Sequence, residues 1–256
     1  MVLAGLRPTE ATLVTVISAS ADIAVVSQGK ELHGLAWRLG FESNDRVKTT
    51  LLDMYAKCGS LKVAQNLFEL LREKRIVSWN AMITGYAMHG HTIEALGLFD
   101  KMKDEMKPDH VTFVGVLSAC SHAGLVTEGR KHFQSMKRNH DIEPKGEHYA
   151  CMVDILGRAG LLDDAHELIT NMSMKPPEAA WGALLNACRM HGNVELAKLM
   201  ARELLDLNPE DSGIYLLLAA TLAERGKWDD LRDIQTMMRQ RRVKKITGHS
   251  FIEDED

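Results

Sequence analysis

The chain has 256 residues, of which 45% are apolar, and this is enough to bury the core of one or two ordinary domains. Its formal net charge of −4 argues mildly against a nucleic-acid partner, although net charge does not fix the field on one face. No run of 18 apolar residues occurs, so no membrane partner is expected, and few aromatics (5%) with few prolines (6) favour helix over strand.

The first twenty residues, MVLAGLRPTEATLVTVISAS, lack the features of a targeting peptide. They contain a single Arg before the first acidic residue, and their apolar residues already follow a helical period. Any targeting signal is therefore expected to lie outside this chain.

Similar helix endings recur along the chain at intervals of 31 to 36 residues. The first, SASADIA, ends at Ala24, and the other six end at Gly59, Gly90, Gly124, Gly160, Gly192 and Gly226. An apolar residue stands eight positions before each glycine and another twelve positions after it. A small residue stands five positions after five of the six. Such a period predicts a repeat architecture.

Each interval holds two helical segments with apolar residues at i, i+3, i+4 and i+7. A glycine with positive φ at the joint would end the first helix, and the small residue after it would let neighbouring helices approach closely. One hairpin cannot bury its apolar face alone, but a stack can. The sequence therefore predicts an all-α, right-handed α-solenoid superhelix of about seven helix-turn-helix repeats, with the first helices on the concave side.

Several stretches resemble the pentatricopeptide repeat family of plant organelles, in its subclass with motifs of mixed length. They are VSWNAMITGY, LLDMYAKCGSL, VTFVGVLSACSHAGLV, EHYACMVDILGRAGLLDDA and WGALLNACRMHGNVELA. The tetratricopeptide repeat has a similar period, but its W-x2-L-G-x2-Y pattern is missing from this chain. The pentatricopeptide resemblance covers essentially the whole chain.

The resemblance also divides the chain. Residues 1–9 look like the tail of a preceding repeat, so the chain is expected to begin within an array. The repeats are then long (10–44), short (45–75), standard (76–109), long (110–145) and short (146–177). Residues 178–243 resemble two C-terminal extension repeats of RNA-editing members, divided at residue 211, and residues 244–256 form a C-terminal tail.

In this family each repeat addresses one RNA base, and the resemblance implies that the fifth and last residues of the repeat make the choice. The pairs are Asn80 with Asp109, Thr49 with Arg75, Val14 with Asn44, and Val114 with Lys145. By the family pattern, Asn80 with Asp109 prefers uracil, then cytosine. The alternative is that Asn80 caps or solvates the first turn of its helix. Only this pair is complete, so a short, weak footprint is expected.

Catalytic chemistry is not expected. Editing members often carry a zinc deaminase domain, which needs H-x-E and C-x-x-C patterns, and neither occurs here. No cofactor and no metal are expected: His89 and His91 flank Gly90, where a polar helix joint is the preferred interpretation. Cys58, Cys120, Cys151 and Cys188 lie in apolar helical stretches, so buried thiols are predicted rather than a disulfide framework or a zinc site.

The segment RQRRVKK, residues 239–245, carries five basic side chains. They are Arg239, Arg241, Arg242, Lys244 and Lys245. Two interpretations stay open: contacts to RNA phosphates, or a solvated helix C-terminus where positive charge suits the helix dipole. Acidic residues such as Glu94, Asp100 and Glu128 fall mostly in the second helices, so Lys and Arg are expected to dominate the groove formed by the first.

The resemblance implies a sequence-preferring, single-stranded RNA-binding adaptor for C-to-U editing of transcripts in a mitochondrion or chloroplast. A deaminase-bearing partner would act in trans, and organellar editing factors would bind the long repeats. Two alternatives remain: a protein-docking scaffold with little RNA affinity, and RNA binding for splicing or transcript stabilisation.

Overall fold

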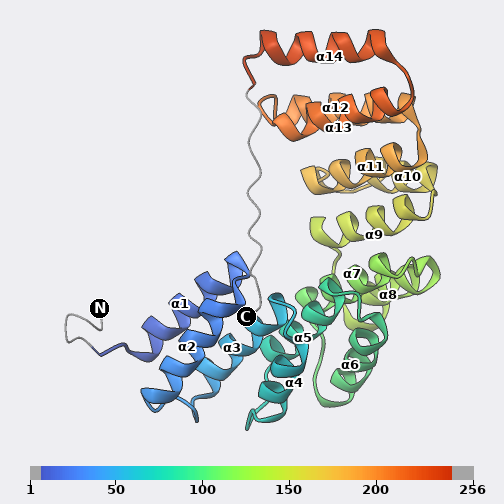
Figure 1. Ribbon diagram of the computed structural model, residues 1–256. Coiled ribbons are helices and arrows are strands. Elements are labelled where there is room, and N and C mark those ends of the chain that lie inside the picture. Colours follow the sequence, from blue (N-terminus) through green and yellow to red (C-terminus); the bar gives the residue numbers. More distant parts are fainter. Residues whose placement is uncertain (1–6, 244–256) are drawn as a thin grey trace. The chain divides into compact units, whose positions relative to one another are not determined.

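The computed structural model describes residues 7–243, and over these residues the regular structure is entirely α-helical (Figure 1). The helices are α1 (Glu10–Ile23), α2 (Val26–Arg38), α3 (Asp45–Lys57), α4 (Leu61–Glu69), α5 (Ile76–Met88), α6 (Thr92–Glu105), α7 (His110–His122), α8 (Val126–His140), α9 (Gly146–Arg158), α10 (Leu162–Thr170), α11 (Glu178–His191), α12 (Val194–Leu207), α13 (Ser212–Glu224) and α14 (Trp228–Gln240). None of these helices combines the length and the apolar character that crossing a bilayer requires.

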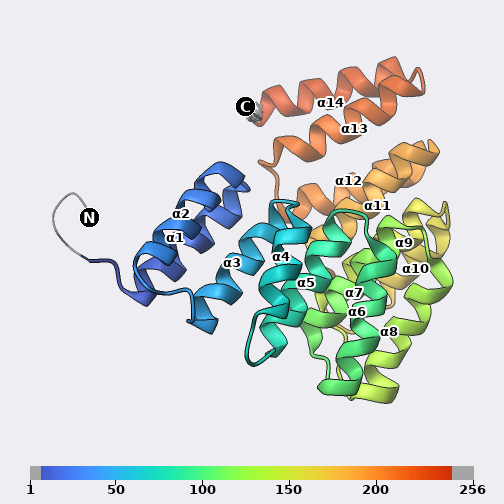
Figure 2. The ribbon, with the colours of Figure 1, turned by 60° about the horizontal axis from the view of Figure 1, so that its bottom comes forward.

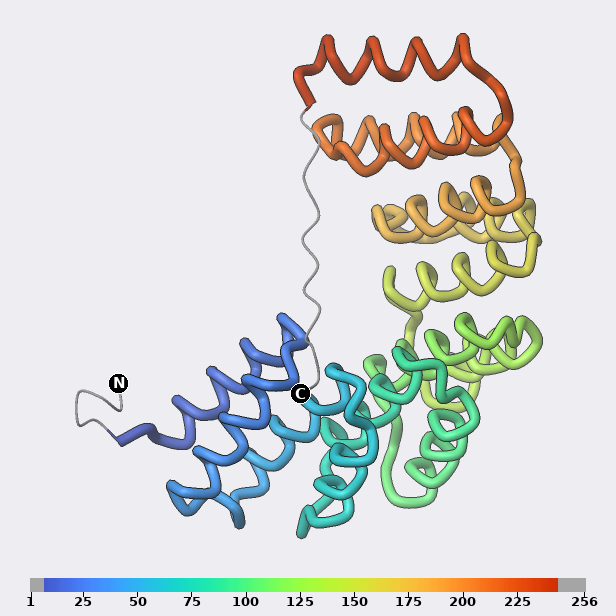
Figure 3. The backbone as a smooth tube through the Cα atoms, viewed as in Figure 1, coloured from blue at the N-terminus to red at the C-terminus, as the bar shows by residue number. Residues whose placement is uncertain are grey.

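The chain separates into two compact units, and each is described by itself. In the N-terminal unit (Met1–Cys151), α1 packs on α3, α3 on α5, and α5 on α7, while α2, α4 and α6 each pack on the odd-numbered helices before and after them (Figures 1 and 2). In the C-terminal unit (Met152–Asp256), α11 packs on α12 and α13, and α13 packs on α14 (Figure 3). Both units are stacks of helical hairpins, which confirms the predicted all-α solenoid class.

The joints between paired helices have the predicted backbone geometry. All six joint glycines have positive φ, for example 76° at Gly90. Ala24 takes the same left-handed conformation, with φ 52°, although a side chain is strained there. The predicted joint therefore ends α1 even without glycine.

Close approach between the odd-numbered helices depends on small residues that the sequence pattern did not single out. A Cβ added at Gly85 on α5 would lie 2.6 Å from the Cβ of Ala56 on α3. In the C-terminal unit, Gly157 stands in the same relation to Ala187. The small residues that follow the joints, such as Ala95, are fully buried as expected.

All four cysteines are thiols. Cys120 and Cys188 are buried, as predicted. The prediction is wrong for Cys58 and Cys151, which are partly exposed; Cys58 is the residue that ends α3, where the helix terminus meets solvent.

Candidate nucleic-acid interface

A groove of about 490 Å³ crosses the odd-numbered helices of the N-terminal unit. Its lining residues are Ser18, Thr49, Thr50, Asp53, Ile76, Val77, Asn80, Ala81, Thr84, Asp109 and Val111. They come from α1, α3, α5 and the start of α7, so the first helices of successive hairpins share one surface. Three predicted base-reading residues, Thr49, Asn80 and Asp109, are brought together in this groove.

Asn80 connects α5 to the start of α7. The side chain is only 7% exposed. Its Nδ2 donates to Asp109 Oδ1 at 3.0 Å, and its Oδ1 accepts from the Thr112 hydroxyl at 2.6 Å. Asn80 therefore does not cap or solvate the first turn of its own helix, because its partners are Asp109, which precedes α7, and Thr112 on α7.

Asp109 is the N-cap of α7, within a capping box completed by Thr112. The Thr112 backbone N–H donates to Asp109 Oδ1 at 2.9 Å, and the Asp109 N–H donates to Thr112 Oγ1 at 3.1 Å. Burial by itself raises the pKa of Asp109. The hydrogen bonds from Thr112 and Asn80 outweigh burial and hold this pKa below its ordinary value, so the residue is a carboxylate.

The donor and acceptor roles in this hydrogen-bond network are fixed by the Asp109 carboxylate. A carboxylate oxygen can only accept, so Asn80 must present its NH2 group to Asp109 and its oxygen to Thr112. Within the described residues, Asp109 Oδ2 has no hydrogen-bond donor, and one N–H of Asn80 is unused. The pair therefore offers one donor and one acceptor to a ligand in the groove.

Two exposed valines lie beside this pair and were missed in the sequence. Val77 is 60% exposed and Val111 is 43% exposed, and both line the groove. Each is the second residue of its helix, three positions before a predicted base-reading residue. That spacing is the signal that identifies them. Their apolar side chains can pack against the flat faces of a base while Asn80 and Asp109 meet its edge.

The other predicted pairs are less well placed. The Thr49 hydroxyl donates to the Asp45 carbonyl at 2.8 Å, and Arg75 is exposed, ion-paired with Glu73 and outside the groove lining. Val14 is partly buried, and Asn44 caps α3. In the last pair, Val114 is partly buried and Lys145 is exposed; neither lines the groove.

The prediction that Lys and Arg dominate the groove is wrong. The lining contains two carboxylates, Asp53 and Asp109, and no Lys or Arg. Glu94, Asp100 and Glu128 do lie on even-numbered helices as predicted, but Asp53 lies on α3, and α5 carries no charged residue at all. Lys57, on α3, is ion-paired with Asp53 at 3.1 Å and Asp22 at 3.3 Å. The groove is therefore not basic: α3 carries both acidic and basic residues, whereas α5 and α7 carry no Asp, Glu, Lys or Arg.

In the described part of the basic C-terminal segment, Arg241 makes a side-chain contact with another helix. Arg241 ends α14 and donates to the Tyr215 hydroxyl at 3.2 Å, which connects α14 to α13. Arg239 and Arg242 are exposed, while Lys244 and Lys245 lie outside the described residues. Phosphate contacts here stay a prediction.

The two joint histidines have separate partners. His89 Nε2 lies 3.0 Å from the Ala56 carbonyl oxygen on the preceding α3, and His91 Nδ1 lies 3.4 Å from Glu94. Among the residues the structure describes, no group of three or more His, Cys, Asp or Glu side chains is placed to hold a metal ion.

Comparison with known proteins identifies the repeats. Models described as PPR repeat match residues 47–76, 111–140 and 147–175, PPR repeat family matches 74–122, and E motif matches 191–253. Pentatricopeptide repeat-containing protein At2g22070 of Arabidopsis thaliana is 47% identical over 255 residues, covering 99% of this chain and 32% of the relative. The chloroplastic CRR2 of the same plant is 42% identical, with 96% and 38% covered. The chain thus spans 32% and 38% of the lengths of these two relatives.

Solved structures agree on the fold. PPR10 from maize has a TM-score of 0.65 at 22% identity and covers 92% of this chain and 35% of that one. The PPR domain of Arabidopsis thaliana protein-only RNase P 1, in complex with tRNA, has a TM-score of 0.52 at 20% identity, with 70% and 95% covered. With its matched repeats, its E motif and relatives that align along almost all of its length, the chain belongs to the pentatricopeptide repeat family.

Proposed function

We propose that this chain binds single-stranded RNA in the groove of its N-terminal unit, as a sequence-preferring adaptor for C-to-U editing of organellar transcripts. The observation that carries the proposal is the oriented donor–acceptor pair of Asn80 and Asp109, set between the exposed side chains of Val77 and Val111. A base between two apolar side chains, with its edge on a polar pair, is a common mode of RNA recognition.

The pair suits uracil in particular. Uracil presents an N–H between two carbonyl oxygens on its Watson–Crick edge, so the N–H can donate to Asp109 Oδ2 while either carbonyl accepts from Asn80. Cytosine has a donor only at one end of that edge and fits in one orientation. This difference supports the order uracil, then cytosine, that the family pattern implies.

The editing role rests on the C-terminal half and on the relatives. Residues 191–253 match the E motif, and relatives are named as chloroplastic or mitochondrial proteins. The proposal places the chain in a chloroplast or mitochondrion. There, a deaminase-bearing partner supplies the chemistry in trans and organellar editing factors complete the assembly. The tRNA complex of the protein-only RNase P 1 repeat domain supports RNA as the ligand class.

Fluorescence anisotropy with short single-stranded RNAs tests the base-reading step. The oligonucleotides differ only by uridine or adenosine at one position, and the proteins are wild type, Asn80→Ala and Asn66→Ala. Asn66 lies exposed on α4, away from the groove, and serves as the matched control. Wild type and Asn66→Ala are expected to prefer uridine by roughly tenfold, and Asn80→Ala is expected to lose the preference, since a bidentate base contact is worth about 1–3 kcal/mol.

Equal affinity of wild type for both RNAs would contradict base reading by this pair. The editing role is tested separately, by sequencing organellar transcripts from plants that lack the protein. Loss of C-to-U conversion at particular sites supports it, whereas altered splicing or transcript abundance with editing intact would assign the chain to those processes instead.

A further inference from the structure

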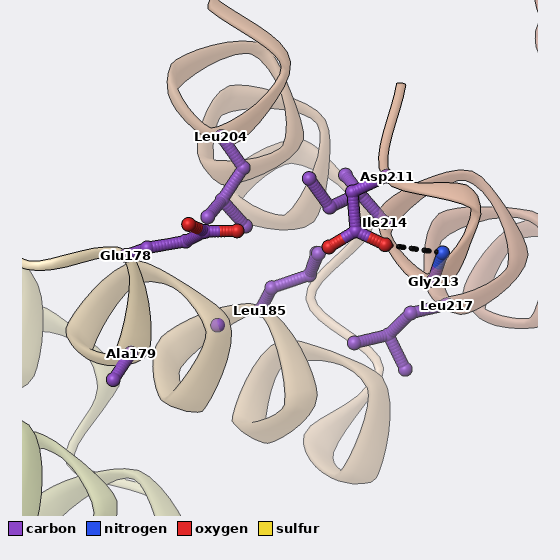
Figure 4. A pocket seen from close by; sticks show the side chains of 9 residues that line it. Glu178, Ala179, Leu185, Leu204, Asp211, Gly213, Ile214 and Leu217 are labelled. Atoms are coloured by element: carbon purple, nitrogen blue, oxygen red, sulfur yellow. Dashed lines mark hydrogen bonds between the residues drawn. The ribbon is translucent and has the colours of Figure 1, made fainter. Parts of the chain in front are cut away.

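A second groove, of about 550 Å³, lies in the C-terminal unit (Figure 4). It is formed where the first turns of α11 and α13 meet the end of α12. Its lining residues are Glu178, Ala179, Gly182, Leu185, Leu204, Asp211, Gly213, Ile214 and Leu217. None of them has a part in the proposed base reading.

Several residues that line this groove stand at the same positions relative to their helices as residues of the first groove, but their side chains differ in size and polarity. Ala179, Gly182, Asp211 and Gly213 stand where Val77, Asn80, Asp109 and Val111 stand in the N-terminal unit, counted from the helix starts. Small residues replace the two valines and the reading amide, which opens the floor onto leucine and isoleucine side chains. No hydroxyl or amide side chain lines it. A nucleobase would find neither the donor nor the apolar clamp of the first groove.

Among the described residues that line the groove, the charged groups are both carboxylates. Figure 4 shows Glu178 and Asp211 on opposite sides of the apolar floor. Asp211 Oδ1 accepts from the Gly213 N–H at 2.7 Å. Within residues 7–243, neither carboxylate is ion-paired with a Lys, Arg or His. Two unneutralised carboxylates repel RNA phosphates and attract basic side chains.

We propose that this groove binds a segment of a partner protein in which a Leu, Ile or Met side chain is flanked by Lys or Arg. The apolar side chain fills the floor formed by Leu185, Ile214 and Leu217, and the basic residues pair with Glu178 and Asp211. The volume falls in the range of pockets that hold compact ligands, roughly 300–1,000 Å³. The partner is a protein, because the lining excludes the features that RNA needs.

A random peptide library displayed on phage, selected against the full chain, tests the proposal. The blocking variant is Gly182→Phe, because a Cβ at Gly182 has no neighbour within 4 Å and the ring can enter the groove without a clash at its root. Gly97→Phe on α6 is the matched control, since its Cβ also points into open space, outside this groove. Wild type and Gly97→Phe are expected to enrich peptides with an aliphatic residue between basic ones, and Gly182→Phe is not.

The affinity of the best enriched peptide is then measured by fluorescence anisotropy. Glu178→Gln combined with Asp211→Asn is expected to weaken binding at least tenfold at low salt, while Asn80→Ala leaves it unchanged, so this result is independent of base reading. The proposal would be overturned if no peptides are enriched, if the enriched peptides are acidic, or if Gly182→Phe enriches the same peptides as wild type. So would competition by single-stranded RNA at the groove. Tighter peptide binding after removal of residues 244–256 would instead make the chain's own segment the occupant.

Discussion

At the scale of single residues, Thr112 decides how Asn80 faces a ligand. Its hydroxyl accepts from the Asp109 N–H and donates to Asn80 Oδ1, and it is fully buried. Without that donor, the Asn80 amide loses the contact that distinguishes its oxygen from its nitrogen. Thr112 is thus a positioning residue for the proposed recognition, as well as part of the α7 cap.

We expect Thr112→Val to lower the free energy of unfolding by about 1–3 kcal/mol, because it leaves a buried acceptor and a backbone donor without partners. Urea denaturation measures this loss, and RNA anisotropy should show a reduced preference for uridine. Thr112→Ser keeps the hydroxyl and should retain the preference. If Val and Ser variants discriminate bases equally well, Thr112 has a structural role only.

His148 is a second buried polar contact between repeats. Its Nδ1 accepts from the Lys145 N–H at 2.9 Å and its Nε2 donates to the His110 carbonyl at 2.8 Å, so it is neutral. Burial lowers the pKa of His148 below 6.5, although both hydrogen bonds and Glu147 act to raise it. Because the unfolded chain binds the proton more readily, the stability from this residue is complete above pH 6.5. It is lost as the pH falls toward the lowered folded pKa.

The free energy of unfolding should therefore decrease between pH 7.5 and 5, and decrease less in His148→Gln. Chemical denaturation at a series of pH values gives the difference between the two slopes. Using the difference removes the contributions of other histidines, such as His33 and His132, which are present in both proteins. Parallel pH profiles would show that His148 does not titrate on unfolding.

How far the sequence predicts the site is clear from these residues. Asn80 and Asp109 are found because the repeat register places them at the fifth and last positions. Thr112 and His148 are not, because each has a partner on another repeat, 32 and 38 residues away. The packing of α5 on α7 brings Thr112 to Asn80, and a tertiary hydrogen bond joins His148 to the His110 carbonyl at the start of α7. The repeat register identifies the proposed reading pair, Asn80 and Asp109, and tertiary contacts determine how the Asn80 amide is oriented.

At the scale of helices, the left-handed joint was predictable because glycine recurs at this position in the repeat. At Ala24 the repeat keeps the left-handed conformation although the residue is not glycine. Ala24 carries the strain that glycine avoids, with φ 52°. The close approach at Gly85 was not predictable, since a glycine inside a helix has no periodic signature of its own.

Substitutions at two joints are expected to change the stability of the fold in opposite directions. Gly90→Ala should destabilise the chain by about 1 kcal/mol, because φ is 76° there and a Cβ meets no neighbour, which leaves backbone strain as the main cost. Ala24→Gly should stabilise it by up to about 1 kcal/mol for the same reason. Thermal unfolding of both variants checks the signs, and equal shifts in one direction would refute the strain argument.

At the scale of the whole molecule, the net charge of −4 was a better guide to the groove than the expected separation of acidic and basic residues between helices. Glu94, Asp100 and Glu128 lie on even-numbered helices as predicted, but the described residues that line the groove include no Lys or Arg. With few phosphate contacts available in this groove, RNA affinity should depend only weakly on salt.

The two buried cysteines, Cys120 and Cys188, lie in different units, so their reactivity can follow the unfolding of each unit separately. Burial raises the pKa of Cys120 to about 11 and of Cys188 to about 12, so at pH 8 roughly one Cys120 thiol in a thousand is ionised. We expect Cys58 and Cys151 to react with iodoacetamide in the native protein, and Cys120 and Cys188 only as each unit unfolds. Mass spectrometry across a urea series measures this. Labelling of native Cys120 at the rate of Cys58 would contradict its burial.

Several of the residues that precede a first helix also cap that helix, and this limits how the proposed recognition can change. Asn44, Asp109 and Asp211 all accept hydrogen bonds from the backbone N–H groups of the helix that follows. Reprogramming this chain to another RNA by altering such a residue therefore also alters where a helix begins. Substitutions tolerated at such a position, in design or in evolution, are therefore limited to the few side chains that cap helices well, chiefly Asn, Asp, Ser and Thr. A repeat's fifth residue does not cap the helix, but Asn80 is constrained in another way, by its hydrogen bonds to Asp109 and Thr112.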